Sequence, residues 1–405
     1  MTSAFAQKKL RVYDAQPVGA VCQSPINLET MTQGQWIALD GRDCIRNAYP
    51  EVQAMFPTGT FTTTSRTLGA TSVASTITAD SVNFVCPGAA GTQPIQASPD
   101  GANWTVAPAT WTAATQLNCV EFCGTRLYAV GTGGDFATGF WAITAGLTAT
   151  ATVTKANWTQ ITGGSTTSLT TSITYSPTYG LTTIIPSGAG TTIYTIADGA
   201  TTAVARTTTS ADKKCVCWTG KNVLCFLNIS NNNWFHTSGD GGATWTDAYA
   251  NVLFGGTGAQ SCASDGNGTV VVLPLATNTN RLALSKDHGA TWRYIYLPTE
   301  VVVQTTGQGL VKYLNGRFVM YQSNGWAFSS DGANWTYEPI GLRGVSVMVP
   351  GIAIAYKTGT WCGVLTTATG NTAVEDFSKF RLPYRISSTT VVPSDYPYYI
   401  KVRSS

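Results

Sequence analysis

The chain has 405 residues, of which 43% are apolar and only 11% are charged, and its formal net charge is +3. This charged fraction is less than half of the roughly 25% that is usual for soluble globular domains. Intrinsic disorder needs a high net charge and few apolar residues, so the composition excludes it. The small net charge gives no electrostatic reason to expect nucleic acid or an anionic membrane as a partner. Thr and Gly abound while Glu occurs six times, which predicts strands and turns and therefore a large all-β protein.

No segment has the pattern of an export signal or a membrane span. The first ten residues lack the apolar core of a signal peptide, and no run of about 18 apolar residues occurs. The ten cysteines are therefore expected as reduced packing residues, because disulfide frameworks belong to short secreted chains. No Cys-x2-Cys pair is present and the chain has two histidines, so we expect no metal site and no cofactor.

The N-terminal 66 residues contain the stretch Gly-Gln-Trp-Ile-Ala-Leu-Asp-Gly. Its Trp36, Asp40 and Gly41 are followed by Tyr49. This arrangement resembles the opening of bacteriophage tail-collar-type domains. The resemblance implies a small collar-like base with Trp36 in its core.

The middle of the chain repeats a short motif that starts with Ser-x-Asp, contains Gly and closes with Trp. Its copies are Ser98, Asp100 and Trp104; Ser238, Asp240, Gly242 and Trp245; Ser285, Asp287, Gly289 and Trp292; and Ser329, Asp331 and Trp335. A weaker echo surrounds Asp198, and from there successive aspartates lie 42, 47 and 44 residues apart. A period of roughly 40–50 residues is typical of propeller blades.

The motif has a structural explanation. Asp in a tight turn accepts hydrogen bonds from the following N–H groups, Gly supplies a positive φ, and Trp buries a large ring. The four copies resemble the Asp-box (bacterial neuraminidase repeat) family. In that family the boxes join the third and fourth strands of a propeller blade and catalyse nothing. His288 fills a variable slot of one box and is expected to be a solvated loop residue.

The C-terminal residues resemble the collar family again. Phe380, Arg381, Leu382 and Pro383 match its Phe-x-Leu-Pro element, and residues 398–402 resemble the end of many phage tail and fibre proteins. We therefore predict an all-β architecture in which a propeller over residues 67–375 is inserted into a base made of residues 1–66 and 376–405. At the observed period the insert holds seven four-stranded blades, or six.

The resemblance implies a structural component of a bacteriophage tail. We expect a virion protein that is assembled in the host bacterial cytoplasm and attached by its base as a homo-oligomer. Its propeller would contact a host-surface glycan or protein receptor as part of a tail fibre or tail tip, or other tail proteins in a hub or nozzle. The sequence alone leaves the distal and the hub positions open.

A sialidase-like glycoside hydrolase is the enzymatic alternative, because residues 380–383 also resemble a sialidase motif whose arginine binds the sialate carboxylate. That motif precedes the first box in sialidases, whereas Arg381 follows the last box here. Glycoside hydrolysis also needs paired carboxylates or a Tyr–Glu pair. The available Glu121, Glu300, Glu338 and Glu375 have no recognisable catalytic context, so no catalytic residues are predicted and we expect no enzymatic activity.

Overall fold

The computed structural model divides the chain into two compact units, Thr63–Ala373 and a flanking unit formed by Met1–Thr62 with Val374–Ser405. The residues that the structure describes are 21–23, 36–38, 43–45, 48–49, 51, 60–68, 76–88, 92–112, 115–137, 139–164, 171–186, 190–227, 233–252, 258–274, 280–298, 311–322, 325–338, 353–364, 369–376, 379–381 and 398–401.

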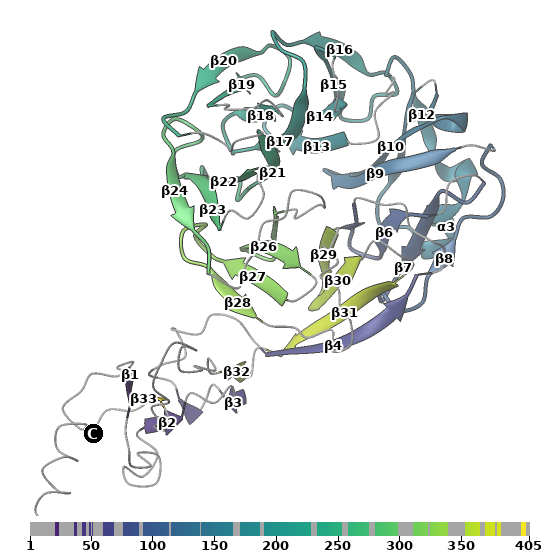
Figure 1. Ribbon diagram of the computed structural model, residues 1–405. Helices are drawn as coiled ribbons and strands as arrows, with labels where there is room; N and C mark the ends of the chain where they lie inside the picture. Colours follow the sequence, from purple (N-terminus) through teal and green to yellow (C-terminus); the bar gives the residue numbers. More distant parts are fainter. Residues whose placement is uncertain are drawn as a thin grey trace, which may run out of the picture. The chain divides into compact units, whose positions relative to one another are not determined.

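The larger unit is a β-propeller whose blades follow one another around a ring (Figure 1). Seven four-stranded sheets form it, which confirms the predicted fold class. Six blades use four consecutive strands. Blade 1 contains β5 (Thr78–Ala79), β6 (Phe84–Pro87), β7 (Ile95–Ser98) and β8 (Thr105–Val106). Blade 2 contains β9 (Gln116–Cys123), β10 (Arg126–Thr132), β11 (Phe140–Thr144) and β12 (Thr159–Ile161). Blade 3 contains β13 (Thr171–Ser176), β14 (Leu181–Pro186), β15 (Thr192–Ala197) and β16 (Val204–Thr207).

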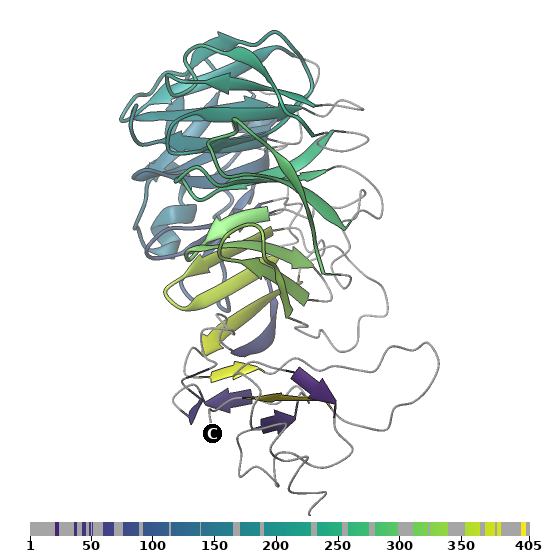
Figure 2. The same ribbon diagram turned by 90° about the vertical axis from the view of Figure 1, so that its left-hand side faces the viewer.

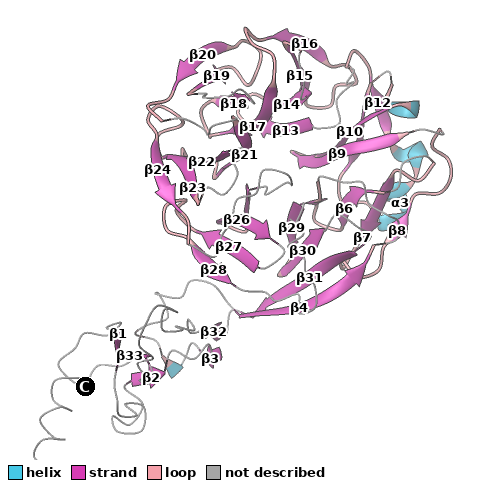
Figure 3. Cartoon of the chain, viewed as in Figure 1, coloured by secondary structure: helices cyan, strands magenta, loops and turns pink. Residues whose placement is uncertain are grey.

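The next three blades repeat this plan. Blade 4 contains β17 (Lys213–Trp218), β18 (Val223–Leu227), β19 (Trp234–Ser238) and β20 (Thr246–Tyr249). Blade 5 contains β21 (Ala259–Ser264), β22 (Val270–Pro274), β23 (Arg281–Ser285) and β24 (Arg293–Tyr296). Blade 6 contains β25 (Val311–Leu314), β26 (Arg317–Gln322), β27 (Gly325–Ser329) and β28 (Thr336–Glu338). Strands dominate, and the short helix α3 (Ala149–Val153) with the 3₁₀ turns Gly134–Phe136 and Lys155–Asn157 belongs to blade 2 (Figure 3).

Blade 7 closes the ring with strands from both ends of the propeller. Its β29 (Ala353–Lys357), β30 (Thr360–Val364) and β31 (Thr369–Asp376) are followed in the sheet by β4 (Thr60–Thr67). Residues 60–66, which the sequence assigned to the base, therefore belong to a blade strand. A ring needs its last sheet to unite the two chain ends, and the N-terminal strand fulfils this role here. The first strand of every blade contacts the first strand of the next, all the way around.

The hydrophobic core lies between the faces of neighbouring blades. Blade 4 contributes Phe226 and Phe235, which pack with Val270, Val272 and Trp292 of blade 5. All five residues of β18 and all five of β22 are buried, because both faces of each strand are covered. This explains their unbroken apolar sequences, in contrast to the alternation of half-exposed strands. Seen from the side, the sheets of successive blades pack against one another (Figure 2).

Four turns between the third and fourth strands share one hydrogen-bond pattern. They surround Asp100, Asp240, Asp287 and Asp331 in blades 1, 4, 5 and 6. In each turn, the serine two residues before the aspartate donates a hydrogen bond of 2.8 to 3.1 Å to its carboxylate. The carboxylate also accepts backbone N–H groups that follow it, as from Thr244 at 2.8 Å. The turn is thus closed by its own side chains.

These hydrogen bonds favour the ionised carboxylates. Burial alone would raise the pKa of each aspartate, but the N–H and O–H donors outweigh it and hold each pKa below its ordinary value. For Asp331 the pKa falls to about 2. The closing tryptophans Trp104, Trp245, Trp292 and Trp335 each donate their Nε1–H to the carbonyl of the glycine three residues earlier, over 2.9 to 3.0 Å.

The same glycines press against the preceding blade. In three of the turns, at Gly242, Gly289 and Gly332, the glycine has a φ between +73° and +99°, and a Cβ added there would collide with a side chain of the neighbour. The added atom would lie 2.5 Å from Thr183 Oγ1 at Gly242, 2.6 Å from Leu224 Cδ1 at Gly289, and 2.9 Å from Leu284 Cδ1 at Gly332. The carbonyl of Gly241 also accepts a hydrogen bond from Thr183 over 3.1 Å. Glycine is therefore required both for the turn and for blade-to-blade contact.

His288 differs from its expected solvated state. It is half-buried with a φ of +60°, and its Nδ1 lies 2.9 Å from the carbonyl oxygen of Thr219 in blade 4. The variable slot of this box thus adds a second contact to the preceding blade. The cause is the position of the slot at the blade boundary, which a linear motif does not reveal.

The flanking unit pairs strands from the two ends of the chain. β33 (Tyr398–Lys401) lies between β1 (Val21–Gln23) and β2 (Trp36–Ala38), and β3 (Asp43–Ile45) pairs with β32 (Lys379–Arg381). The Trp36 side chain is fully buried, and Tyr49 is half-buried.

Two of the residues that carry the collar resemblance, Phe380 and Arg381, belong to β32, where Phe380 pairs with Cys44. Asp40, Gly41, Leu382 and Pro383 lie outside the described residues.

Candidate functional site

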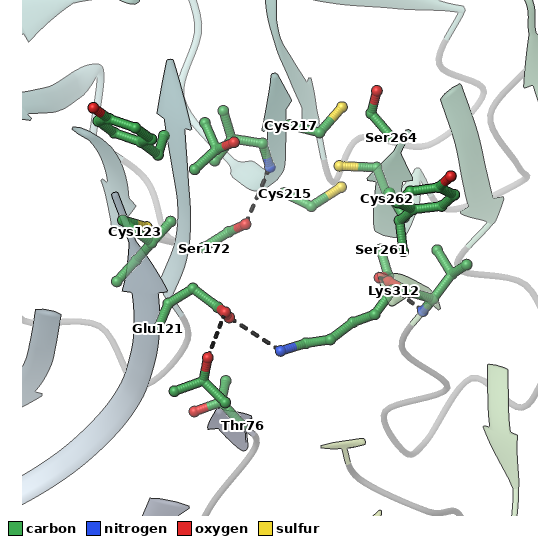
Figure 4. A pocket seen from close by; sticks show the side chains of 18 of the residues that line it. Thr76, Glu121, Cys123, Ser172, Cys215, Cys217, Ser261, Cys262, Ser264 and Lys312 are labelled. Atoms are coloured by element: carbon green, nitrogen blue, oxygen red, sulfur yellow. Dashed lines mark hydrogen bonds and ion pairs between the residues drawn. The ribbon is translucent and has the colours of Figure 1, made fainter. Parts of the chain in front are cut away.

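A cavity of about 510 Å³ occupies the centre of the propeller (Figure 4). The first strand of every blade contributes to its wall. Hydroxyl, thiol and aromatic side chains dominate the lining, and its charged residues are Glu121, Lys214 and Lys312. A central cavity walled by several blades is a common place for a ligand, so this is the candidate site.

An ion pair crosses the cavity. Lys312 Nζ of blade 6 lies 3.0 Å from Glu121 Oε2 of blade 2, although blades 1 and 7 stand between them on the shorter way around the ring. Thr78 donates a hydrogen bond of 2.9 Å to Glu121 Oε1, and Lys312 also donates to the carbonyl of Ile77 over 2.9 Å. Both side chains are partly shielded from water, with 26% of Glu121 and 18% of Lys312 exposed. The pair therefore ties three blades together at the cavity.

Hydroxyl side chains link the first strands of adjacent blades. The first strand of a blade is an edge strand whose outward N–H groups need acceptors. A Ser or Thr of the preceding blade supplies them at four places. The pairs are Thr76 with Val120 N–H at 3.1 Å, Thr78 with Phe122 N–H at 3.1 Å, Ser172 with Val216 N–H at 3.1 Å, and Ser261 with Val311 N–H at 3.2 Å.

Five cysteines line the cavity: Cys119, Cys123, Cys215, Cys217 and Cys262. The nine cysteines whose side chains the structure describes are all free thiols. Burial raises the pKa of Cys119 to about 12 and also raises the pKa of Cys123 and Cys262. These thiols are therefore protonated near neutral pH. Within the described part of the chain, no group of three or more His, Cys, Asp or Glu residues could hold a metal ion.

A histidine–aspartate pair lies outside the cavity. His236 on β19 is fully buried, and its Nδ1 is 2.9 Å from Asp247 Oδ1 on β20. Burial lowers the pKa of His236, and the hydrogen bond and negative charge of Asp247 offset this only in part. Thr209 also donates to Asp247 over 2.6 Å. The imidazole is enclosed and is not among the described residues that line the cavity.

The chemical capacity of the cavity is limited by its acids. Glu121 is the single carboxylate among the described residues that line it, and Lys312 already occupies one of its oxygens. Two carboxylates at a set separation, the usual requirement for glycoside hydrolysis, are not brought together there. Arg381 belongs to β32 of the flanking unit. The arrangement is suited to binding through hydroxyl, thiol and aromatic groups.

The structure brings none of the predicted turn residues into the cavity. The turn aspartates and tryptophans lie between third and fourth strands, whereas first strands form the cavity wall. Sequence reasoning named Glu121 only as an unplaced carboxylate and missed Lys312 as its partner. The signal that could have found the hydroxyl links is spacing, because three of the four Ser/Thr–N–H pairs are 44 residues apart, close to the blade period.

We predict that breaking the cross-cavity ion pair destabilises the propeller. Glu121→Gln or Lys312→Met alone should lower the free energy of unfolding by about 1–3 kcal/mol, because each leaves a partly shielded charge without its partner. The double variant should lose less than the sum of the two. Lys214→Met, in the same cavity but outside the pair, is the matched control. Strictly additive losses in denaturant titrations would contradict the interaction.

We also predict that acid weakens blade 4 through His236. Because the pKa of His236 is lowered in the folded state, the unfolded chain binds the proton more readily. The free energy of unfolding is therefore highest above about pH 6.5, the ordinary pKa of histidine, and decreases as the pH falls below it. The free energy of unfolding can change with pH by about 1.4 kcal/mol per pH unit. Unfolding titrations between pH 5 and 8 should show the slope, His236→Gln should flatten it, and His288→Gln, the other histidine, should leave it in place. An unchanged slope in His236→Gln would refute this role.

Comparison with known proteins identifies the fold. No family model and no curated protein matches the chain. Among solved structures, YCF48 bound to D1 peptide has a TM-score of 0.54 at 14% identity, covering 78% of this chain and 97% of that one. Virginiamycin B lyase from Staphylococcus aureus has a TM-score of 0.56 at 11% identity, covering 78% and 100%. Chaetomium thermophilum Raptor has a TM-score of 0.55 at 8% identity, covering 82% and 30%. At such identities the similarity concerns the fold alone, and it agrees with a β-propeller.

Proposed function

We propose that this chain is a non-enzymatic structural component of a bacteriophage tail. The flanking unit attaches it to the particle, and the propeller contacts the host surface or a neighbouring tail subunit. It is assembled in the bacterial cytoplasm, acts in the virion, and is present in several copies, because tail parts follow closed rotational symmetry and repeated weak contacts gain in avidity. The turn motifs are Asp-boxes in this proposal.

The observation that carries the proposal is that segments from both ends of the chain form the flanking unit. Its strands pair residues near the start of the chain with residues near its end, as in Trp36 with Lys401 and Cys44 with Phe380. Both sequence pieces that resemble the tail-collar family thus belong to one compact unit that is separate from the propeller. Such an arrangement supports an attachment unit that carries an inserted binding unit.

The surface of the propeller offers groups suited to contact. Tyr249 and Tyr296 are 71% and 70% exposed. Each lies four residues after a turn tryptophan, at the end of the outer strand of its blade, so neighbouring blades present the same group at equivalent positions. Exposed tyrosines supply apolar area with a polar tip, which suits both protein and glycan partners. This supports a role in recognition.

The sialidase-like alternative finds less support. Arg381 belongs to β32 of the flanking unit, whereas the described cavity lining belongs to the propeller. The described cavity lining also provides one carboxylate rather than two. If the alternative holds, purified protein should release sugar from host polysaccharide or from a fluorogenic sialoside, and Arg381→Ala should abolish that release.

We predict that Trp36→Ala prevents incorporation into particles. Removing this fully buried ring should destabilise the flanking unit by about 3–5 kcal/mol while the propeller stays folded. Particles produced with this variant should therefore lack the chain, as measured by mass spectrometry of purified virions and by labelling with an antibody against the propeller. Normal incorporation of Trp36→Ala, or wild-type particles without the chain, would contradict the proposal.

The matched control changes the exposed surface instead. Tyr249→Ala and Tyr296→Ala should be incorporated normally, because neither side chain is buried. Reduced adsorption to host cells by such particles would place the propeller at the receptor, whereas normal adsorption with defective assembly or loss of DNA would place it in a hub or nozzle. Either result is consistent with attachment through the flanking unit.

A further inference from the structure

Three of the cavity thiols gather at one blade boundary. Cys215 and Cys217 belong to β17 of blade 4, and Cys262 belongs to β21 of blade 5. These are the first strands of neighbouring blades, and they contact each other. Because residues two apart on a strand share a face, Cys215 and Cys217 both face blade 5, at the wall of the cavity. The close-up shows their side chains directed toward Cys262 (Figure 4).

The three thiols belong to two strands that lie against each other across the boundary, β17 and β21. Cys262 packs against the buried cluster that contains Cys215 and Cys217. A disulfide needs Cα atoms within about 7 Å of each other, and adjacent strands in contact can meet this requirement. Cys215 and Cys217 are less able to bridge each other, because alternate residues of an extended strand have Cα atoms nearly 7 Å apart, the usual limit for a disulfide. The favoured partner of each is therefore Cys262.

We propose that Cys262 forms a disulfide with Cys215 or Cys217, which joins blades 4 and 5 covalently at the wall of the cavity when a small-molecule disulfide is present. Such a site is a redox modification site, and its oxidant belongs to the class of glutathione disulfide. The cross-link does not depend on the role in a phage tail, although a particle that leaves the cytoplasm meets the oxidising conditions that would form it.

The chemistry proceeds by two thiol–disulfide exchanges. One cysteine, as thiolate, attacks a sulfur of the reagent, forms a mixed disulfide and releases one glutathione thiolate. The second cysteine then attacks the protein sulfur of the mixed disulfide, forms the inter-blade bond and releases the second glutathione. The two protein thiols lose two protons and two electrons, and the reagent disulfide takes up both electrons and becomes two thiols.

The rate of the first exchange depends on how accessible each thiol is to the reagent and on how much of it is ionised. Cys262 is only partly covered, whereas Cys215 and Cys217 are 5% and 6% exposed, so the reagent meets Cys262 first from the cavity. Removal from bulk water raises the pKa of the Cys262 thiol, and a small thiolate fraction makes the attack slow near neutral pH. The third cysteine stays beside the new bond as a thiol, which allows the bond to exchange between Cys215 and Cys217.

The experiment incubates the purified full-length chain with excess glutathione disulfide and then counts thiols after unfolding with a blocking reagent. We expect the loss of two titratable thiols and their recovery after reduction with dithiothreitol. Trypsin cleaves after Lys214, Lys221 and Arg281, so non-reducing mass spectrometry should find peptide 215–221 linked to peptide 222–281. The second peptide also contains Cys225, which the variants below distinguish.

Cys262→Ser should remove both the thiol loss and the linked peptides, and so should the double variant Cys215→Ser/Cys217→Ser. Cys119→Ser, a cavity cysteine of blade 2 outside the cluster, should leave both intact. Each variant is first checked for a wild-type melting profile under reducing conditions, and Cys262→Ala replaces Cys262→Ser if the serine variant does not fold. An unchanged thiol count in the wild type, or linked peptides that persist without Cys262, would overturn the proposal.

Discussion

The ring depends on the contact between a turn glycine and the blade that precedes it. Where Gly242, Gly289 and Gly332 touch the neighbouring blade, no room remains for a Cβ. The aspartate and serine of each turn fix the loop, and the tryptophan anchors it to the glycine carbonyl. One short motif therefore both ends the third strand of its own blade and sets how closely the preceding blade approaches, which lets a repeating sequence close into a ring.

Closure of the ring creates the cavity and determines its chemistry. Because every blade supplies its first strand, the wall is built from residues far apart in the sequence, and unpaired N–H groups at the strand edges are met by hydroxyls such as Thr78 and Ser172. Two of the three charged side chains in the described lining, Glu121 and Lys312, form an ion pair and balance each other's charge. What remains is a surface of hydroxyl, thiol and aromatic groups, which is suited to contact and to thiol exchange. Glu121 is the single carboxylate among the described residues of the lining.

The propeller could be predicted from sequence because its turns are local. A serine, an aspartate and a tryptophan within eight residues carry the whole hydrogen-bond pattern, as at Ser238, Asp240 and Trp245. Blade 7 lacks the motif, and the contribution of β4 to it depends on pairing between distant segments. The cavity was missed for the same reason, since 191 positions separate Glu121 from Lys312. The phage-tail role rests on resemblance and stays a prediction.

The central claim is that the turn glycines hold neighbouring blades together, and one comparison of two variants tests it directly. Gly242→Ala places a methyl group against Thr183 of blade 3, whereas Gly199→Ala, at a similar positive φ, meets nothing within 4 Å. Both should lose about 1–2 kcal/mol from backbone strain, and the account predicts a further loss of about 1–3 kcal/mol for Gly242→Ala alone from overpacking at the blade boundary. Equal losses of unfolding free energy in the two variants would contradict it.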